Sequence, residues 1–175
     1  MTKPVFPKLS KNWTKRLWWA QWPLYVLLFL GMSHSLNRHL LEEGTKLPNL
    51  SLYTQSGAPT QIKWPQSEQT IVLYVFAPWC SICRVSMPGL NLIPQERARV
   101  IGIALDWDSA KQVEDFVAST GFKGEWYLGG TKIAEALKVT GYPSYYVVSG
   151  DGLVKHRDRG LTTPPGLWLR TIPDN

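Results

Sequence analysis

Cysteine is almost absent from this sequence. Its 175 residues contain only Cys80 and Cys83, separated by two residues. One such pair does not make a disulfide scaffold, which needs several bridges. Structural zinc needs four ligands, commonly from two such pairs, and the three histidines (His34, His39 and His156) lack ligand spacing. No zinc site is predicted, and the pair is a redox couple, a half-site for a soft metal such as Cu(I), or a structural disulfide.

Acidic side chains are missing from the start of the chain. Residues 1–16 contain five Lys or Arg and no Asp or Glu, so most of the net charge of +6 lies there. The rest of the chain is close to neutral. It has no cluster of basic residues interleaved with aromatics, which argues against a nucleic-acid-binding surface.

Charge of either sign is missing from residues 17–37. An apolar stretch of this length is enough to cross a bilayer as a helix, and three tryptophans crowd its N-terminal end, where interfacial aromatics lie. We interpret 17–36 as a transmembrane anchor, with a cleaved signal peptide and a buried core helix as alternatives. The basic residues before an anchor would place the N-terminus in the cytoplasm and the rest of the chain outside it.

The chain is therefore expected to have four parts. They are a basic cytoplasmic tail (1–16), an anchor or signal peptide (17–36), a linker (37–48) and a folded domain (49–175). Outside the cytoplasm thiols are oxidised unless something keeps them reduced, so the position of the domain bears directly on the state of the cysteines.

Strands and helices are expected to alternate along the folded domain. Residues 70–77 and 99–106 are apolar, β-branched runs of strand length, typical of strands buried on both faces. The other expected elements are a strand at 50–53, a helix from Cys80 past Pro88 that the proline would kink, a helix between Ser109 and Gly121, a short helix at 131–139, a hairpin at 144–158 and a closing helix at 164–170. This order predicts a three-layer α/β/α sandwich with a mixed sheet.

The position of the cysteines favours redox chemistry. The thiolate is the reactive form of cysteine, and a helix N-terminus favours it through unpaired N–H groups and the helix dipole. Cys80 lies where the strand at 70–77 gives way to a helix, and Cys83 follows about one turn later, within disulfide reach. We expect Cys80 to attack a substrate and Cys83 to resolve the mixed disulfide, with Trp79 flanking Cys80. A structural disulfide over so short a loop would add little stability.

A second stretch supports this interpretation, namely "VTGYPSYYVV". Pro143 stands directly before a predicted strand. A cis proline in a tight turn beside a reactive sulfur would present backbone groups to an incoming peptide. An ordinary trans proline at a strand start is the alternative, but the cysteine motif earlier in the chain favours cis.

These motifs resemble a known fold. The order of "FAPWCSIC", "CRVSMP", a strand, helices and "VTGYPSYYVVSGDG" is similar to the thioredoxin fold, and in kind to its membrane-anchored, TlpA-like bacterial branch. That branch holds extracytoplasmic thiol–disulfide oxidoreductases, including cytochrome c maturation proteins and copper-sensitivity suppressors. The resemblance covers about residues 47–172. It implies that Cys80 is the nucleophile, Cys83 the resolving thiol, Pro143 the cis proline, Tyr142 the residue that pairs with the substrate backbone, and Gly160 a residue at the groove edge.

The chain departs from the family at two carboxylates. Relatives usually carry a buried Asp six residues before the first cysteine, where this chain has Tyr74. Many read Cys-Arg-x-Glu-Met-Pro, and here Ser86 takes the Glu position. Asp106, at the end of the strand predicted over 99–106, is a candidate proton relay because the carboxyl ends of parallel strands converge. The alternative for Asp106 is a solvated loop acid or a helix cap.

The resemblance implies an enzyme of defined type. It would be a single-pass protein of the bacterial inner membrane, with its catalytic domain in the periplasm, exchanging disulfides with protein substrates and acting as a reductant. The cysteine pair would carry the electrons without a cofactor, and a membrane redox partner would recharge it. A copper-binding module, a disulfide-donating oxidase and an adaptor that holds a client are the alternatives.

Overall fold

A computed structural model describes residues 21–32, 35, 39–65, 69–162 and 164–172. The chain divides into two units, Met1–Leu36 and Asn37–Asn175. In the first unit, residues 21–32 form a helix. Among the described residues no helix is both long and apolar enough to span a bilayer. The anchor predicted over 17–36 reaches beyond the described residues at both ends and stays a prediction, as does the tail at 1–16, which lies outside them.

The second unit is built on one mixed sheet of seven strands, in the order β2-β1-β5-β4-β3-β6-β7. The central strands β3, β4 and β5 are parallel, and every other pairing is antiparallel. The strands are β1 (Leu50–Tyr53), β2 (Pro59–Ile62), β3 (Thr70–Phe76), β4 (Ala98–Ala104), β5 (Glu125–Leu128), β6 (Ser144–Val148) and β7 (Val154–Arg159).

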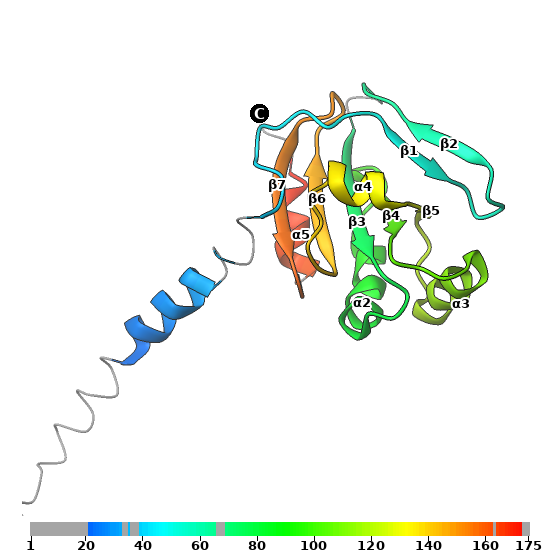
Figure 1. The fold of residues 1–175 in the computed structure, drawn as a ribbon. Coiled ribbons are helices and arrows are strands. Elements are labelled where there is room, and N and C mark those ends of the chain that lie inside the picture. The colour runs from blue at the N-terminus through cyan, green and yellow to red at the C-terminus, as the bar shows by residue number, and fades with distance from the viewer. Residues whose placement is uncertain (1–20, 33–34, 36–38, 66–68, 163, 173–175) are drawn as a thin grey trace, which may run out of the picture. The chain divides into compact units, whose positions relative to one another are not determined.

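Helices cover both faces of this sheet (Figure 1). One face carries α2, a 3-10 helix, α3 and α5, and the other carries α4 together with the chain leading into β1. The helices are α2 (Ser81–Ser86), the 3-10 helix η1 (Met87–Leu92), α3 (Ala110–Thr120), α4 (Thr131–Ala136) and α5 (Pro164–Arg170). The predicted α/β fold with a mixed sheet is confirmed.

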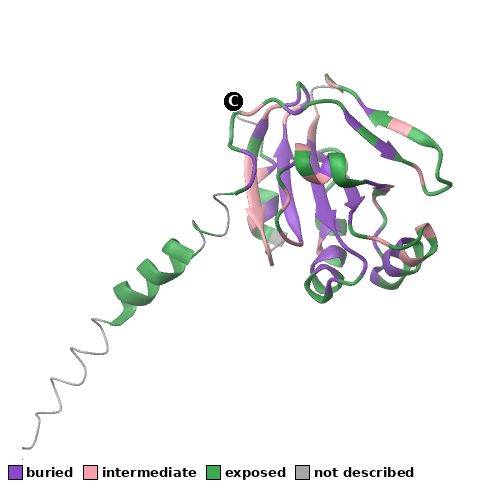
Figure 2. Cartoon of the chain, viewed as in Figure 1, coloured by how far each residue is buried: buried purple, intermediate pink, exposed green. Residues whose placement is uncertain are grey.

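Strand β3 lies in the middle of the molecule. Its even-numbered residues Val72, Tyr74 and Phe76 pack under α2 and α3, and its odd-numbered residues pack on the opposite face. Because side chains alternate across a strand, a strand buried on both faces must be apolar throughout. Figure 2 shows these central strands as the buried part of the sheet.

Helices α3 and α5 match their predicted boundaries, whereas α4 ends three residues early, at Ala136, and the helix after Cys80 also differs from its prediction. The side chain of Ser109 caps α3 by accepting from the backbone N–H of Gln112, and Gly121 ends α3 in the left-handed conformation at φ 66°. The helix after Cys80 is shorter than predicted. It ends at Ser86 and continues as η1, with Pro88 in the first turn, because a proline is tolerated where its missing N–H is not needed. Pro88 therefore starts a new helix and does not kink a continuous one.

Two strands had no prediction from the sequence. Strand β2 begins with Pro59 and buries only Ile62, so it has almost no apolar alternation. It is an edge strand, where a proline is permitted. Strand β5 has four residues, of which only Trp126 and Leu128 are buried. Both strands are held mainly by hydrogen bonds to neighbouring strands. Their own residues therefore give little indication of a strand in the sequence.

Residues 39–48, described within the predicted linker, pack closely against the sheet. Leu40, Leu41 and Leu47 are buried in the core. The N–H of Leu47 donates to the carbonyl of Gly152 at 2.8 Å, in the turn of the β6–β7 hairpin. The described part of this segment therefore contributes apolar surface to the core of the second unit.

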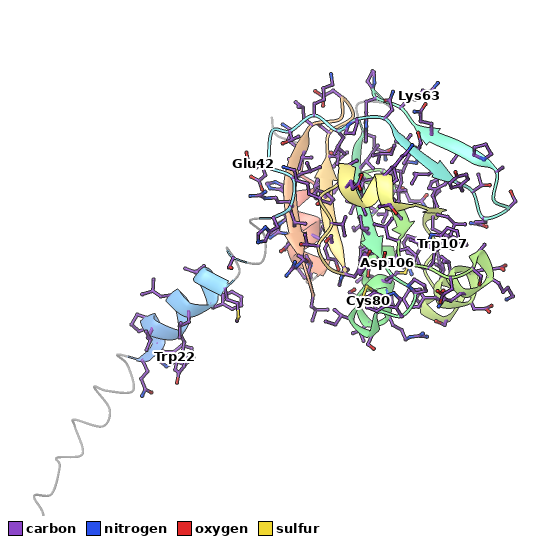
Figure 3. All side chains as sticks on the ribbon, viewed as in Figure 1. Trp22, Glu42, Lys63, Cys80, Asp106 and Trp107 are labelled. Atoms are coloured by element: carbon purple, nitrogen blue, oxygen red, sulfur yellow. A yellow bond between two sulfur atoms is a disulfide. The ribbon has the colours of Figure 1, made fainter. Side chains whose placement is uncertain are left out.

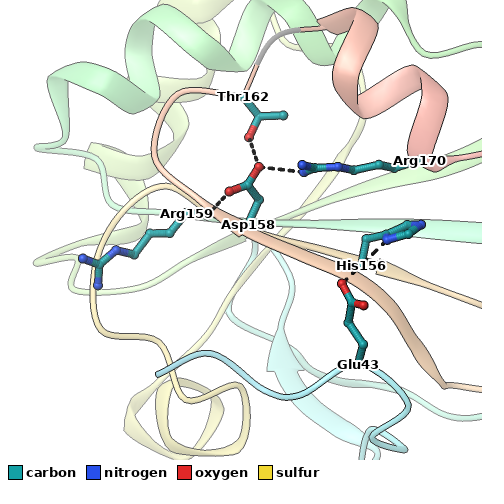
Figure 4. Close-up of polar contacts among 6 residues, drawn as sticks. All are labelled: Glu43, His156, Asp158, Arg159, Thr162 and Arg170. Carbon is teal, nitrogen blue, oxygen red and sulfur yellow. Dashed lines mark hydrogen bonds and ion pairs between the residues drawn. The ribbon is translucent and has the colours of Figure 1, made fainter. Parts of the chain in front are cut away.

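Polar side-chain contacts fasten both the segment and the last helix to β7 (Figure 4). Nδ1 of His156 lies 3.7 Å from the carboxylate of Glu43. Asp158 accepts from Arg170 of α5 at 2.6 Å and from the hydroxyl of Thr162 at 3.2 Å. Strand β7 thus joins the chain entering the sheet to the helix that closes the domain.

We predict that Leu47→Ala lowers the free energy of unfolding of the full chain by about 2–5 kcal/mol, as expected when a buried leucine is truncated and a cavity remains. Denaturant unfolding followed by circular dichroism measures this. Glu42→Ala, at an exposed position of the same segment, is the control. Equal stabilities for the two variants would show that the segment is not part of the folded core.

Candidate active site

The two cysteines lie just beyond the carboxyl end of β3. Cys80 is the N-cap of α2 and Cys83 lies in its first turn. They form a disulfide, with their Cα atoms 5.2 Å apart. The loop is closed by the N–H of Cys80, which donates to the carbonyl of Ala77 at 3.1 Å. The disulfide therefore spans the first turn of α2, directly after the central strand of the sheet.

The two sulfur positions differ in access and in hydrogen bonding. Cys83 has no exposed surface, whereas Cys80 keeps 7% of its surface exposed. The N–H of Cys83 donates to Sγ of Cys80 at 3.1 Å. When the pair is reduced, a donor aimed at that sulfur stabilises negative charge on it. The arrangement agrees with the predicted roles, in which Cys80 meets the substrate first and Cys83 remains covered.

Three loops meet around Cys80, and each contributes one predicted residue. Trp79 comes from the β3–α2 loop, Asp106 from the β4–α3 loop and Tyr142 from the loop before β6. The indole Nε1–H of Trp79 donates to the backbone carbonyl of Asp106 at 3.0 Å. The phenol of Tyr142 donates to the carboxylate of Asp106 at 2.8 Å. Figure 3 shows Cys80 and Asp106 at the same end of the sheet.

The Tyr142–Pro143 peptide bond is cis, as predicted. The carbonyl of Pro143 accepts from the N–H of Gly160 at 2.8 Å, and Gly160 has a φ of 95°, in the left-handed region that favours glycine. The cis-proline turn is thus tied to the chain leaving β7. The rings of Tyr142 and Trp79 meet edge to face, 5.6 Å apart, which places the turn beside the cysteine loop.

The two positions that lack the usual carboxylates are bonded to each other. The hydroxyls of Tyr74 and Ser86 lie 2.9 Å apart, and the phenol also donates to the backbone carbonyl of Cys83 at 3.2 Å. Both side chains are buried. Burial raises the pKa of the Tyr74 phenol, with a smaller contribution from Tyr145. A neutral, hydrogen-bonded pair therefore lies under Cys83.

Sequence reasoning marked Tyr74 and Ser86 as departures but did not pair them. One signal for this pairing was available in the sequence. Both hydroxyls lie in apolar surroundings, twelve residues apart, and a buried hydroxyl needs a hydrogen-bond partner. The contact between Tyr142 and Asp106 was also missed, because it joins loops 36 residues apart. Within the described parts of the chain, no group of three or more His, Cys, Asp or Glu is placed to hold a metal ion.

A disulfide-forming Cys-x-x-Cys pair at a strand-to-helix junction, a cis proline beside it, and a mixed sheet with helices on both faces define the thioredoxin-fold class of thiol–disulfide proteins. Comparison with known proteins gives the family. The family model described as Redoxin matches residues 42–166. The chain belongs to the Redoxin family.

Relatives of the chain carry names in the same class. The thioredoxin-like protein YneN of Bacillus subtilis is 26% identical over 128 residues, 70% of this chain and 75% of YneN. The thiol:disulfide interchange protein DsbE of Escherichia coli is 28% identical over 110 residues, 58% of this chain and 55% of DsbE. The chain therefore matches about half the length of DsbE.

A solved structure shows the same fold. The crystal structure of a putative thiol:disulfide interchange protein DsbE from Chlorobium tepidum superposes with a TM-score of 0.62. The two chains share 20% sequence identity, and the match covers 74% of this chain and 95% of that one. At this identity the likeness supports the fold.

We predict that Tyr74→Phe lowers the free energy of unfolding at pH 7 by about 1–2 kcal/mol, because two hydrogen bonds of a buried phenol are lost. The loss should shrink as pH rises. The pKa of Tyr74 in the folded chain lies above its ordinary value of 10.0, so its contribution to stability is full below pH 10 and falls as the unfolded chain ionises above it.

Denaturant unfolding of the full chain between pH 7 and pH 11 checks this prediction. Tyr53→Phe, on an exposed tyrosine of β1, is the matched control. A stability difference between Tyr74→Phe and the native chain that stays constant with pH would show that burial does not hold this phenol neutral.

Proposed function

We propose that this chain exchanges disulfides with protein substrates through Cys80 and Cys83, acting as a reductant outside the cytoplasm. The observation that carries the proposal is the disulfide pair itself, in which Cys80 keeps a small exposed surface and Cys83 is fully covered. A difference in solvent access between the two sulfurs suits an attacking thiol and a resolving thiol. A structural disulfide does not require such a difference.

The reaction needs only the two sulfurs and protons from solvent. The Cys80 thiolate attacks one sulfur of the substrate disulfide, so that bond breaks and the substrate thiolate leaves and takes up a proton. The product is a mixed disulfide. The Cys83 thiol then loses its proton and attacks Sγ of Cys80, which releases the second substrate thiol. Two electrons and two protons pass to the substrate, and the Cys80–Cys83 disulfide forms.

The surface around Cys80 suits a protein substrate. Trp79, Ile82 and Val85 are 62%, 50% and 73% exposed, so the loop and helix that carry the two cysteines present apolar side chains at the surface. Exposed apolar groups of this kind mark surfaces for protein contact. Tyr142 and Pro143 lie beside them, and we assign to this turn the pairing with the backbone of the substrate.

The N-terminal segment and the family support a proposal for the cellular setting. We propose a single-pass anchor at 17–36 in a bacterial inner membrane, with the catalytic domain in the periplasm. Since the pair ends each cycle oxidised, a membrane redox partner must return two electrons to it. The names of the relatives support thiol–disulfide interchange. Cytochrome c maturation and copper tolerance are the two roles that the family resemblance offers.

We predict that Cys83→Ser accumulates a mixed disulfide between Cys80 and its substrate, because the resolving thiol is gone. Cys80→Ser should form no such adduct. Non-reducing electrophoresis and mass spectrometry of the purified chain, incubated with a disulfide-containing peptide, measure both outcomes. Stoichiometric Cu(I) binding by the native chain, with no adduct from Cys83→Ser, would favour a copper-binding module.

We predict a reduction potential near that of thioredoxin, about −270 mV. Equilibration of the full chain with glutathione or thioredoxin, followed by quantification of the reduced and oxidised forms, gives this value. A potential near about −120 mV is that of a strong oxidant and would reverse the proposed direction, making the chain a disulfide donor.

A further inference from the structure

Asp106 connects the two side chains that border Cys80. Its backbone carbonyl accepts from Trp79, and its carboxylate accepts from Tyr142. The Trp79 and Tyr142 rings then meet edge to face at an interplanar angle of 83°. These three contacts form a closed triangle, which we call the rim cluster: Trp79, Asp106 and Tyr142.

Asp106 itself is held by its neighbours. The N–H of Leu105 donates to the carbonyl of Phe76 at 2.9 Å, which ties the loop to β3. On the other side, the indole of Trp107 donates to the carbonyl of Gly129 at 2.9 Å. Asp106 lies between these anchors with a φ of 50°, a region that Asp tolerates better than most residues. The acceptor atoms of the rim cluster therefore rest on a fixed loop.

Two residues of the rim cluster are next in sequence to residues of the reactive site. Trp79 precedes Cys80 and Tyr142 precedes Pro143, so each ring belongs to a residue adjacent to one that we assign to the reaction. Trp79 is largely exposed and Tyr142 is partly exposed. Without the Asp106 carboxylate, the Tyr142 side chain would lose its hydrogen bond, while Trp79 would keep its bond to the backbone carbonyl of residue 106 and lose the ordered ring that packs on it. Ordering such side chains on contact with a substrate costs binding energy.

The phenol that binds Asp106 is a donor over the whole physiological range. Burial, followed by the hydrogen bond to Asp106, raises the pKa of Tyr142. The carboxylate is therefore engaged by a neutral phenol that comes from the substrate-facing turn. Cys83 meets a different polar group, the phenol of Tyr74, on the buried side of α2.

We propose that the carboxylate of Asp106 is a positioning group, which holds Tyr142, and through the Tyr142 ring Trp79, in place before a protein substrate arrives. This inference rests on the proposed function and deepens it. Asp106 acts through the two rings that contact the substrate, and it does not take the proton of Cys83. Its loss should slow exchange with peptides more than exchange with a disulfide too small to contact the rim.

The test compares two probes in single-turnover reduction by the full, pre-reduced chain. One is a fluorescent peptide cyclised by a disulfide, and the other is glutathione disulfide. Asp106→Gly removes the carboxylate but keeps a positive φ accessible, and Tyr142→Phe removes the phenol. In each variant, the ratio of the peptide rate to the glutathione rate should fall about three- to tenfold. The double variant should be no worse than either single variant, because both remove the same hydrogen bond.

Asp106→Asn separates positioning from proton transfer. The amide oxygen still accepts from the Tyr142 phenol, and Asn tolerates positive φ, so this variant should restore the native ratio and the native pH profile of the rate. Asp108→Asn, at an exposed aspartate of the same loop, is the control. If Asp106→Asn loses as much rate as Asp106→Gly and shifts the pH profile, the residue relays a proton and the inference is wrong. If the native chain reduces neither probe, the proposed function is wrong. That outcome is distinct from the failure of the positioning role, in which the native chain reduces both probes.

Discussion

The burial of β3 on both faces is the constraint on which the site depends. It pairs with β4 on one side and with β6 on the other, so its carboxyl end has little freedom to move. The cysteine loop leaves from that end, and the cis-proline turn enters the neighbouring strand β6 there. Two loops that are far apart in the sequence are brought together because one apolar strand fixes both.

The polar groups around the cysteines are divided between two sides of α2. On the buried side, Tyr74 and Ser86 satisfy each other and the carbonyl of Cys83, and none of these groups carries charge. On the exposed side, Asp106 supplies a carboxylate, which Tyr142 engages. Among the residues that the structure describes, no carboxylate is buried, so the cost of desolvating one near Cys83 does not arise.

Much of this arrangement could be predicted from the sequence, and what was missed has physical reasons. The strands that are buried on both faces and the caps at Ser109 and Gly121 have strong local signals, because each depends on the residue types at those positions. The cis proline has a weak local signal and was predicted because the cysteine motif precedes it in the chain. Strands β2 and β5 have weak signals, because their partners hold them and few of their side chains are buried. The pairs Tyr74–Ser86 and Asp106–Tyr142 depend on which loops meet, and no local pattern records this.

The edges of the sheet decide how the domain meets other proteins. Strand β7 is one edge, and its sequence Val-Lys-His-Arg-Asp-Arg is densely charged. Its beginning is already paired with the incoming chain, since Val154 exchanges hydrogen bonds with Gly44 and Thr45. The other edge, β2, starts with a proline that has no N–H to offer. Charged, covered or proline-bearing edges resist the addition of a foreign strand. At high local concentration, copies of the domain would therefore not polymerise readily by pairing their sheet edges. Contacts with other proteins would instead be made by the loops around Cys80.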